Sequence, residues 1–113
     1  MPSNSRPVYL KLRDRIAAAI IAGDYEEGAM LPSVRAYAVE QGANPLTVAK
    51  AYQQFQTDGF VEVRRGIGMF VKPGAAEQLR ARERERFLEE EWPAIHARIR
   101  ILGFAPSDLV ARV

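Results

Sequence analysis

The sequence predicts a mainly helical α+β fold, with one domain over residues 1–74 and a short helical segment over residues 75–113. Three observations lead to this prediction. Apolar residues recur at helical spacing up to residue 58, and apolar and polar residues then alternate over residues 60–71. Helical spacing returns after the Pro73-Gly74 pair, a combination that interrupts regular structure and is typical of a domain edge.

The first helix is expected to begin at Pro7 and to end before Gly23. The fixed φ of proline suits a first helical turn, and glycine is common where a helix ends. Charged residues lie between the apolar ones and would occupy the other faces of the helix. The residues expected on its buried face are Tyr9, Leu12, Ile16, Ala19 and Ile20.

Two shorter helices are expected next, joined by a tight turn that contains Gly42. Ser33 is a good N-cap for a helix over residues 34–41. Asn44 is a second N-cap candidate, followed by Pro45 at the first position of a helix that ends at Gly59. The expected inward face of this last helix consists of Val48, Ala51, Tyr52 and Phe55. Two short helices joined in this way form a helix-turn-helix.

A β-hairpin is expected directly after the helix-turn-helix. Residues 60–64 read as a strand, residues 65–68 as a tight loop and residues 69–71 as the returning strand. Residues 29–31 are a candidate for a further short strand. A hairpin in this position is a wing, so the first domain is predicted to be a winged helix-turn-helix.

The C-terminal segment combines charge with an apolar stripe. Residues 77–91 are highly charged, and Pro93 is expected to kink the helix because it removes one backbone donor. Gly103 would end this helix, and Ser107 is a candidate cap for a last short helix. Large apolar residues follow steps of three and four and form a stripe too large to leave in water. They are Leu88, Trp92, Ile95, Ile99 and Leu102.

The composition excludes several classes of protein and site. With 113 residues, 48% hydrophobic and 27% charged, the chain is predicted to be globular, with one domain or a small domain and an appendage. There is no cysteine, so disulfides, thiolate metal sites and cysteine nucleophiles are excluded. No apolar run is long enough for a membrane span, and the start MPSNSRPVYLKLR lacks the apolar core of a signal peptide. A cytoplasmic protein is therefore expected.

Enzymatic chemistry and cofactors are not expected. His96 is the sole histidine and stands beside no cluster of carboxylates, so no metal site is predicted. The Gly66-x-Gly68 pattern lacks the third glycine and the following lysine of a nucleotide-binding loop. The net charge of +2 is weak evidence for a nucleic-acid partner. Residues 1–74 hold nine Lys or Arg and seven Asp or Glu, so any attraction for phosphate must come from local clustering.

Residues 7–72 resemble the DNA-binding domain of the GntR superfamily of bacterial regulators, and the short tail is similar to the YtrA-like subfamily. This resemblance implies binding to double-stranded DNA and a C-terminal pair of helices used mainly for dimerisation. One departure is Glu27, where the family usually has proline, and it affects only a turn. The matching motifs are Pro7-Val8-Tyr9, Gly28 with Leu31-Pro32-Ser33-Val34-Arg35, Asn44-Pro45-Leu46-Thr47-Val48, Ala51-Tyr52 and Gly66-Ile67-Gly68-Met69-Phe70-Val71.

The second helix of the helix-turn-helix is the candidate reader of DNA bases. Its leading turn enters the major groove in this motif. That turn consists of Asn44, Pro45, Leu46 and Thr47. Lys50 lies one turn further on and can reach a phosphate or a guanine. Helix capping is an equally good explanation of Asn44 and Pro45. The Tyr52 hydroxyl is a further candidate contact to a phosphate, but burial in the core is an equally good explanation of Tyr52.

Two further groups of candidate DNA contacts flank this helix. Ser33 and Arg35 stand at the start of the preceding helix, where free N–H groups attract phosphate, and the resemblance implies that Arg35 contacts DNA. Arg64, Arg65, Gly66 and Gly68 form the expected wing tip, where glycine allows a close backbone approach and an arginine can enter a minor groove. The alternatives are a simple cap at Ser33, a solvated Arg35 and incidental charges on the hairpin.

The apolar stripe, flanked by Phe87 and Phe104, is predicted to be a dimer interface. Its alternative is packing of the tail on the first helix of the same chain, around Tyr9 and Leu12. The sequence therefore predicts a homodimeric regulator, a repressor in the main reading, that binds a two-fold symmetric operator. The alternatives are a winged-helix module that binds protein, and a fragment of a larger regulator with an aminotransferase-like domain. No small-molecule effector can be identified from the residues.

Overall fold

The structure is a computed structural model that describes residues 7–113. It divides into two compact units, one ending at Arg80 and one comprising Ala81–Val113, and each unit is described by itself. The predicted boundary at residue 74 separates a DNA-binding domain from a dimerisation segment, and it stays a prediction. The expectation about a signal peptide rests partly on residues 1–6, which lie outside the described residues.

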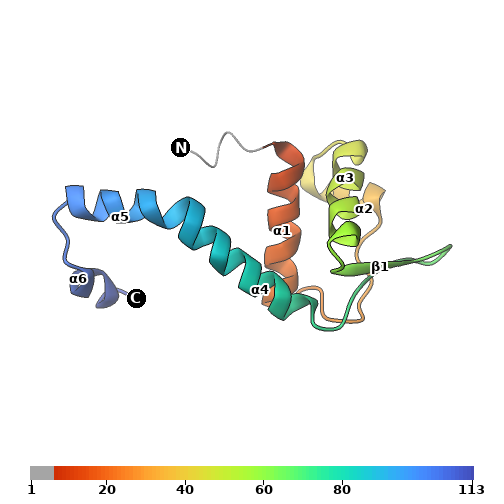
Figure 1. Ribbon diagram of the computed structural model, residues 1–113. Coiled ribbons are helices and arrows are strands. Elements are labelled where there is room, and N and C mark those ends of the chain that lie inside the picture. The colour runs from red at the N-terminus through yellow and green to blue at the C-terminus, as the bar shows by residue number, and fades with distance from the viewer. Residues whose placement is uncertain (1–6) are drawn as a thin grey trace. The chain divides into compact units, whose positions relative to one another are not determined.

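The first unit contains three helices, a β-hairpin and the beginning of a fourth helix (Figure 1). The helices α1 and α3 lie side by side and begin at the same end, and the hairpin projects beyond the helices. The predicted mainly helical α+β fold with a helix-turn-helix and a wing is confirmed. The elements are α1 (Val8–Ala22), α2 (Val34–Gln41), α3 (Pro45–Thr57), β1 (Val61–Arg64), β2 (Gly68–Val71) and α4 (Ala75–Arg86).

Capping residues set the boundaries of α2 and α3 as the sequence predicts. The Ser33 hydroxyl oxygen accepts a hydrogen bond from the Ala36 amide at 3.1 Å. The Asn44 side-chain oxygen accepts one from the Leu46 amide at 2.8 Å. Gly42 ends α2 with a φ of 63°, a left-handed conformation that few other residues adopt easily. The turn between the two helices is therefore fixed by local chemistry.

The wing is a two-stranded antiparallel hairpin in which Val61 pairs with Val71 and Arg64 pairs with Gly68. The short strand predicted at residues 29–31 is reduced to a single bridge between Met30 and Phe70. Proline at position 32 has no N–H to donate, so it does not extend this pairing.

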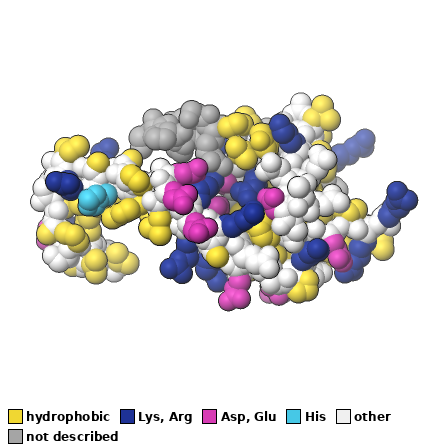
Figure 2. All heavy atoms as spheres, in the orientation of Figure 1, with side chains coloured by type: hydrophobic (Ala, Val, Ile, Leu, Met, Phe, Trp, Pro, Cys, Tyr) yellow, Lys and Arg dark blue, Asp and Glu magenta, His cyan; other side chains and the backbone are white. Residues whose placement is uncertain are grey.

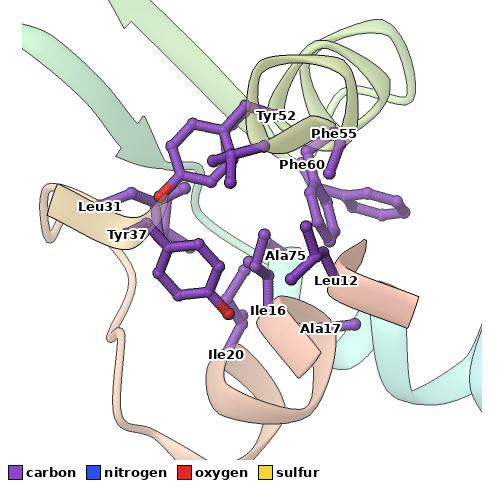
Figure 3. Packing of buried hydrophobic residues seen from close by; sticks show 14 of the residues in the cluster. Leu12, Ile16, Ala17, Ile20, Leu31, Tyr37, Tyr52, Phe55, Phe60 and Ala75 are labelled. Atoms are coloured by element: carbon purple, nitrogen blue, oxygen red, sulfur yellow. The ribbon is translucent and has the colours of Figure 1, made fainter. Parts of the chain in front are cut away.

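The core of the first unit lies between α1 and α3, and α2, the hairpin and α4 close it (Figure 3). All four residues predicted on the inward face of α3 are buried, and Phe55 has no exposed area. On α1, Leu12, Ile16 and Ile20 are buried as predicted, whereas Tyr9 and Ala19 are only half-buried. Burial of this set accounts for the stability of the unit, since apolar area removed from water is the main favourable contribution to folding.

The first turns of α4 also belong to this core, although the sequence analysis assigned them to the tail. Ala75 and Leu79 are each 1% exposed. The guanidinium of Arg80 donates a hydrogen bond to the Ile21 carbonyl oxygen at 3.4 Å. The i, i+4 spacing of Ala75 and Leu79 is the sequence signal of this packing. It is difficult to recognise because charged residues surround these two positions.

Pro93 changes the hydrogen bonding of the helix in the second unit. The α-helix gives way to a π-helical stretch, η2 (Phe87–Glu91), followed by α5 (Trp92–Ile101). The Trp92 amide donates to the Phe87 carbonyl, five residues back. A proline ring clashes with the carbonyl four residues before it, and the wider π-helical turn accommodates this clash ahead of Pro93.

The last helix, α6 (Pro106–Val110), begins earlier than predicted. The prediction that Ser107 caps it is wrong, because Ser107 lies inside the helix. The Asp108 carboxylate instead accepts a hydrogen bond from the Ala105 amide at 2.9 Å. Pro106 suits the first helical position and therefore places the cap at Ala105.

Tyr52 is a core residue, and the prediction that its hydroxyl binds phosphate is wrong. The side chain is 3% exposed, and its hydroxyl donates a hydrogen bond to the Pro32 carbonyl at 2.8 Å. Burial raises the pKa of this hydroxyl well above its ordinary value of 10.0. The bond ties α3 to the segment before α2.

Replacing Tyr52 with phenylalanine should lower the free energy of unfolding by about 1 kcal/mol, because it removes one hydrogen bond to a carbonyl that stays in place. Because the pKa of Tyr52 is raised in the folded state, the unfolded chain ionises first, and stability should fall as the pH rises above about 10. This fall should be less steep in the variant. Urea unfolding between pH 8 and pH 11 measures both effects, and equal slopes would contradict the account.

Candidate nucleic-acid interface

The first turn of α3 is exposed between two open hollows. One hollow of about 350 Å³ is lined by Val8, Tyr9, Leu46, Thr47 and Lys50, at the neighbouring starts of α1 and α3 (Figure 1). A second hollow of about 390 Å³ lies between α2 and α3, and its lining includes Arg35 and Pro45. The predicted contacts at the start of α3 therefore share one surface with Arg35.

The starts of α2 and α3 differ in the backbone donors that they offer. In α3, Pro45 has no N–H, and the amides of Leu46 and Thr47 are bonded to the side chain and carbonyl of Asn44. In α2, the Ser33 side chain occupies only the Ala36 amide, and within residues 7–113 the amides of Val34 and Arg35 have no hydrogen-bond partner. The start of α2 thus suits a phosphate, whereas the start of α3 offers side chains alone.

Ser33 and Asn44 both act as caps, as the alternative reading of these residues holds. The capping bond of Asn44 uses its side-chain oxygen, and within the described residues its side-chain nitrogen makes no hydrogen bond. Capping and DNA contact are therefore compatible at this position.

Three basic side chains around α1, α2 and α3 differ in their contacts. Arg13 faces Asp58 at 3.8 Å and lies over the Phe55 ring, so it holds α1 to the end of α3. Lys50 is exposed, and its ammonium lies 4.1 Å from the centre of the Tyr9 ring. Arg35 is also exposed, and within residues 7–113 it makes no hydrogen bond or ion pair. Lys50 and Arg35 are thus available beside the start of α3.

The two arginines of the wing are not equivalent. Arg64 forms an ion pair with Glu62 at 3.1 Å and lies over the Phe70 ring at 4.2 Å. Arg65 is exposed in the loop and has no ion pair in the part of the chain that the structure describes. Figure 2 shows basic side chains at the end of the projecting hairpin. Arg65 is therefore the more available cation of the wing.

The two glycines of the wing have structural roles of their own. Gly66 has a φ of 77°, which the tight loop requires and glycine adopts at little cost. At Gly68, a Cβ atom would lie 2.7 Å from the Met30 sulfur, so a side chain there would require the exposed Met30 side chain to move. These requirements exist whether or not the wing approaches DNA.

The sequence analysis missed the contribution of α1 to this surface. Val8 and Tyr9 line the same hollow as Leu46 and Lys50, and Val8 is 62% exposed. Tyr9 was assigned to the core, although its position in the first turn of α1 is a signal that it stands at the end of the helix.

Among residues 7–113, no helix is both long and apolar enough to span a membrane.

Comparison with known proteins identifies the family. Residues 8–71 match the model of the bacterial regulatory proteins of the gntR family. The chain belongs to the GntR family. The family model describes bacterial regulatory proteins, and relatives of this chain are named HTH-type transcriptional regulators.

Two relatives from Bacillus subtilis support a YtrA-like assignment within the GntR family. The HTH-type transcriptional repressor YtrA is 35% identical over 74 residues, which cover 66% of this chain and 57% of YtrA. The HTH-type regulator YhcF is 37% identical over 68 residues, covering 60% of this chain and 56% of YhcF. The matched region thus spans little more than half the length of these relatives.

Solved structures resemble a larger part of the chain. A GntR family transcriptional regulator from Listeria monocytogenes has a TM-score of 0.75 and 27% identity, with 95% of this chain and 92% of that one covered. A structure described as a GntR family regulator from Bacteroides thetaiotaomicron has a TM-score of 0.69 and 35% identity, covering 93% and 91%.

Replacing Arg35 or Arg65 with alanine should weaken DNA binding of this GntR protein by about 1–3 kcal/mol each and leave thermal unfolding unchanged. Both side chains are exposed, and neither has an ion pair within the described residues, so the fold does not depend on them. Fluorescence anisotropy at fixed salt measures the loss.

Arg112→Ala is the matched control, because it removes the same charge from an exposed position in the second unit. It should bind DNA about as the unmodified chain does. Unchanged affinity in the Arg35 and Arg65 variants would remove these residues from the interface.

Proposed function

We propose that this GntR-family regulator is a repressor that binds a two-fold symmetric operator as a homodimer. The observation that carries the proposal is the exposed first turn of α3. This turn presents side chains but no free N–H group of the backbone, and the cations Lys50 and Arg35 lie beside it. Such a turn suits base edges in the major groove, where sequence is read. The likeness to YtrA, which is a repressor, supports the direction of regulation.

The proposed DNA contacts divide into three groups with different tasks. The start of α3 reads bases in the major groove through Asn44, Pro45, Leu46 and Thr47, with Lys50 beside it. The start of α2 holds a phosphate through Ser33, the side chain of Arg35 and the two free amides. The wing approaches the flanking minor groove through Arg65 and Gly66, while Arg64 and Gly68 shape the hairpin.

The apolar side chains of the second unit support the proposal of a homodimer. The segments η2, α5 and α6 contain no buried residue, and apolar side chains gather on the visible face of this unit (Figure 2). Trp92 is 38% exposed and Leu88 is 59% exposed. Exposed apolar surface of this kind marks an interaction site. The proposed interface comprises Phe87, Leu88, Trp92, Ile95, Ile99, Leu102 and Phe104.

A second copy of the chain is the partner that DNA binding requires. One winged unit contacts a short half-site, and a net charge of +2 gives little attraction to DNA of random sequence. Two copies at a fixed spacing multiply the contacts, and two-fold symmetry matches a symmetric operator. We therefore assign DNA binding to residues 1–74 and dimerisation to residues 75–113.

Recovery of genomic fragments on the immobilised protein, followed by gel shift over a range of salt concentrations, tests this function. Specific fragments should be retained, and the logarithm of the binding constant should fall linearly with the logarithm of salt concentration. A chain that retains no DNA at low salt would instead be a winged-helix module that binds protein.

Replacing Thr47 with alanine should weaken binding to the recovered operator much more than binding to random DNA. Base contacts give specificity, whereas phosphate contacts only position the protein. Competition gel shifts with both DNAs measure the ratio. An equal loss on both DNAs would show that α3 reads no base through Thr47.

Replacing Trp92 and Ile99 with glutamate should give a monomer with a folded winged unit, because two charges cannot be buried in an apolar interface. Sedimentation velocity at micromolar concentration measures the state. Ala97→Glu is the control, since it adds one such charge to an exposed position of α5 away from the stripe, and it should remain dimeric. A double variant that stays dimeric would place the interface elsewhere.

A further inference from the structure

Leu46 is an exposed apolar side chain that the fold does not explain. It lies in the first turn of α3 and is 80% exposed, whereas the buried face of α3 is formed by Val48, Ala51, Tyr52 and Phe55. Folding therefore gains little from a leucine at this position. Val8, at the start of α1, is 62% exposed and lines the same hollow. Two elements thus contribute apolar side chains to one open surface.

Within residues 7–113, the hollow around Leu46 combines this apolar surface with one cation, Lys50. Thr47 and Lys50 complete its lining, and the Lys50 ammonium is placed 4.1 Å from the centre of the Tyr9 ring. The backbone of α3 adds no donor, because the Leu46 and Thr47 amides are already bonded to Asn44. At the start of α1, the Val8 and Tyr9 amides make no hydrogen bond within residues 7–113 and can face the same negative charge as Lys50. The hollow therefore suits a small apolar group that lies near a negative charge.

The major groove of DNA presents one group of this kind. The C5-methyl group of thymine is the apolar feature of the base edges, and phosphates line both sides of the groove. Cytosine has only a hydrogen atom at C5, and the edges of adenine and guanine are marked by hydrogen-bonding groups that an apolar side chain cannot satisfy.

We propose that Leu46, together with Val8, reads the methyl group of one thymine in each operator half-site, while Lys50 contacts a phosphate nearby. The inference rests on the proposed function, since it requires α3 to enter the major groove. It assigns a base preference to a residue whose side chain can make no hydrogen bond. Leu46 then contributes to specificity beside Thr47, and Lys50 contributes to affinity.

Deoxyuridine provides the test, because it pairs as thymidine does and lacks only the methyl group. In a duplex recovered from genomic fragments, each thymine of one half-site is replaced in turn. At one position, the affinity of the unmodified protein should fall about fourfold, because the complex then no longer buries one methyl group. Replacement in both half-sites should multiply the two losses.

Two variants at position 46 complete the test. Leu46→Ala should lose most of the preference for thymine over deoxyuridine, because only Val8 is then left to contact the methyl group. Leu46→Met keeps an apolar side chain of similar reach and should retain the preference for thymine. Both variants should melt as the unmodified protein does, since the position is exposed.

The outcomes separate the inference from the proposed function. If the protein binds the recovered duplex and no thymine shows a loss, the inference about Leu46 is wrong and the proposed function stands. A loss that persists undiminished in Leu46→Ala would also overturn the inference, because Leu46 would then contribute nothing to reading the methyl group. If no duplex is retained at any salt concentration, the proposed function fails, and the inference fails with it.

Discussion

The packing of α1 against α3 is the interaction on which the proposed DNA interface depends. Phe55 is fully buried between the two helices, and Arg13 covers its ring while facing Asp58. This packing aligns the first turns of both helices, so that Val8 and Tyr9 lie beside Leu46 and Lys50. Because the core holds α3 along its length, the first turn stays exposed without losing its position, as a rigid reader of base edges requires.

A small chemical difference separates the tasks of α2 and α3. Both helices begin with a capping side chain, but α3 has proline at its first position and α2 has valine. The proline removes one amide, and the bonds to Asn44 occupy the next two. The amides of Val34 and Arg35 stay free within the described residues, so one helix start is suited to phosphate and the other to bases.

Local signals made most of the fold predictable, and long-range contacts account for what the sequence analysis missed. Ser33, Asn44 and Pro45 mark helix ends by their own chemistry, so the bounds of α2 and α3 follow from the sequence. The bond between the Tyr52 hydroxyl and the Pro32 carbonyl joins residues 20 positions apart, and periodicity cannot distinguish it from a phosphate contact. The position of Lys50 on the Tyr9 ring likewise requires the packed structure.

Directed cleavage of the operator tests most directly whether α3 and the wing form one DNA interface in a dimer. The chain has no cysteine, so a single introduced cysteine can carry an iron chelate that cuts nearby DNA. A chelate on Ala49→Cys, an exposed position of α3, should cut in the major groove of both half-sites. One on Ile67→Cys at the wing tip should cut in the flanking minor grooves, with the same two-fold symmetry. Cuts at a single half-site, or from only one of the two positions, would contradict the account.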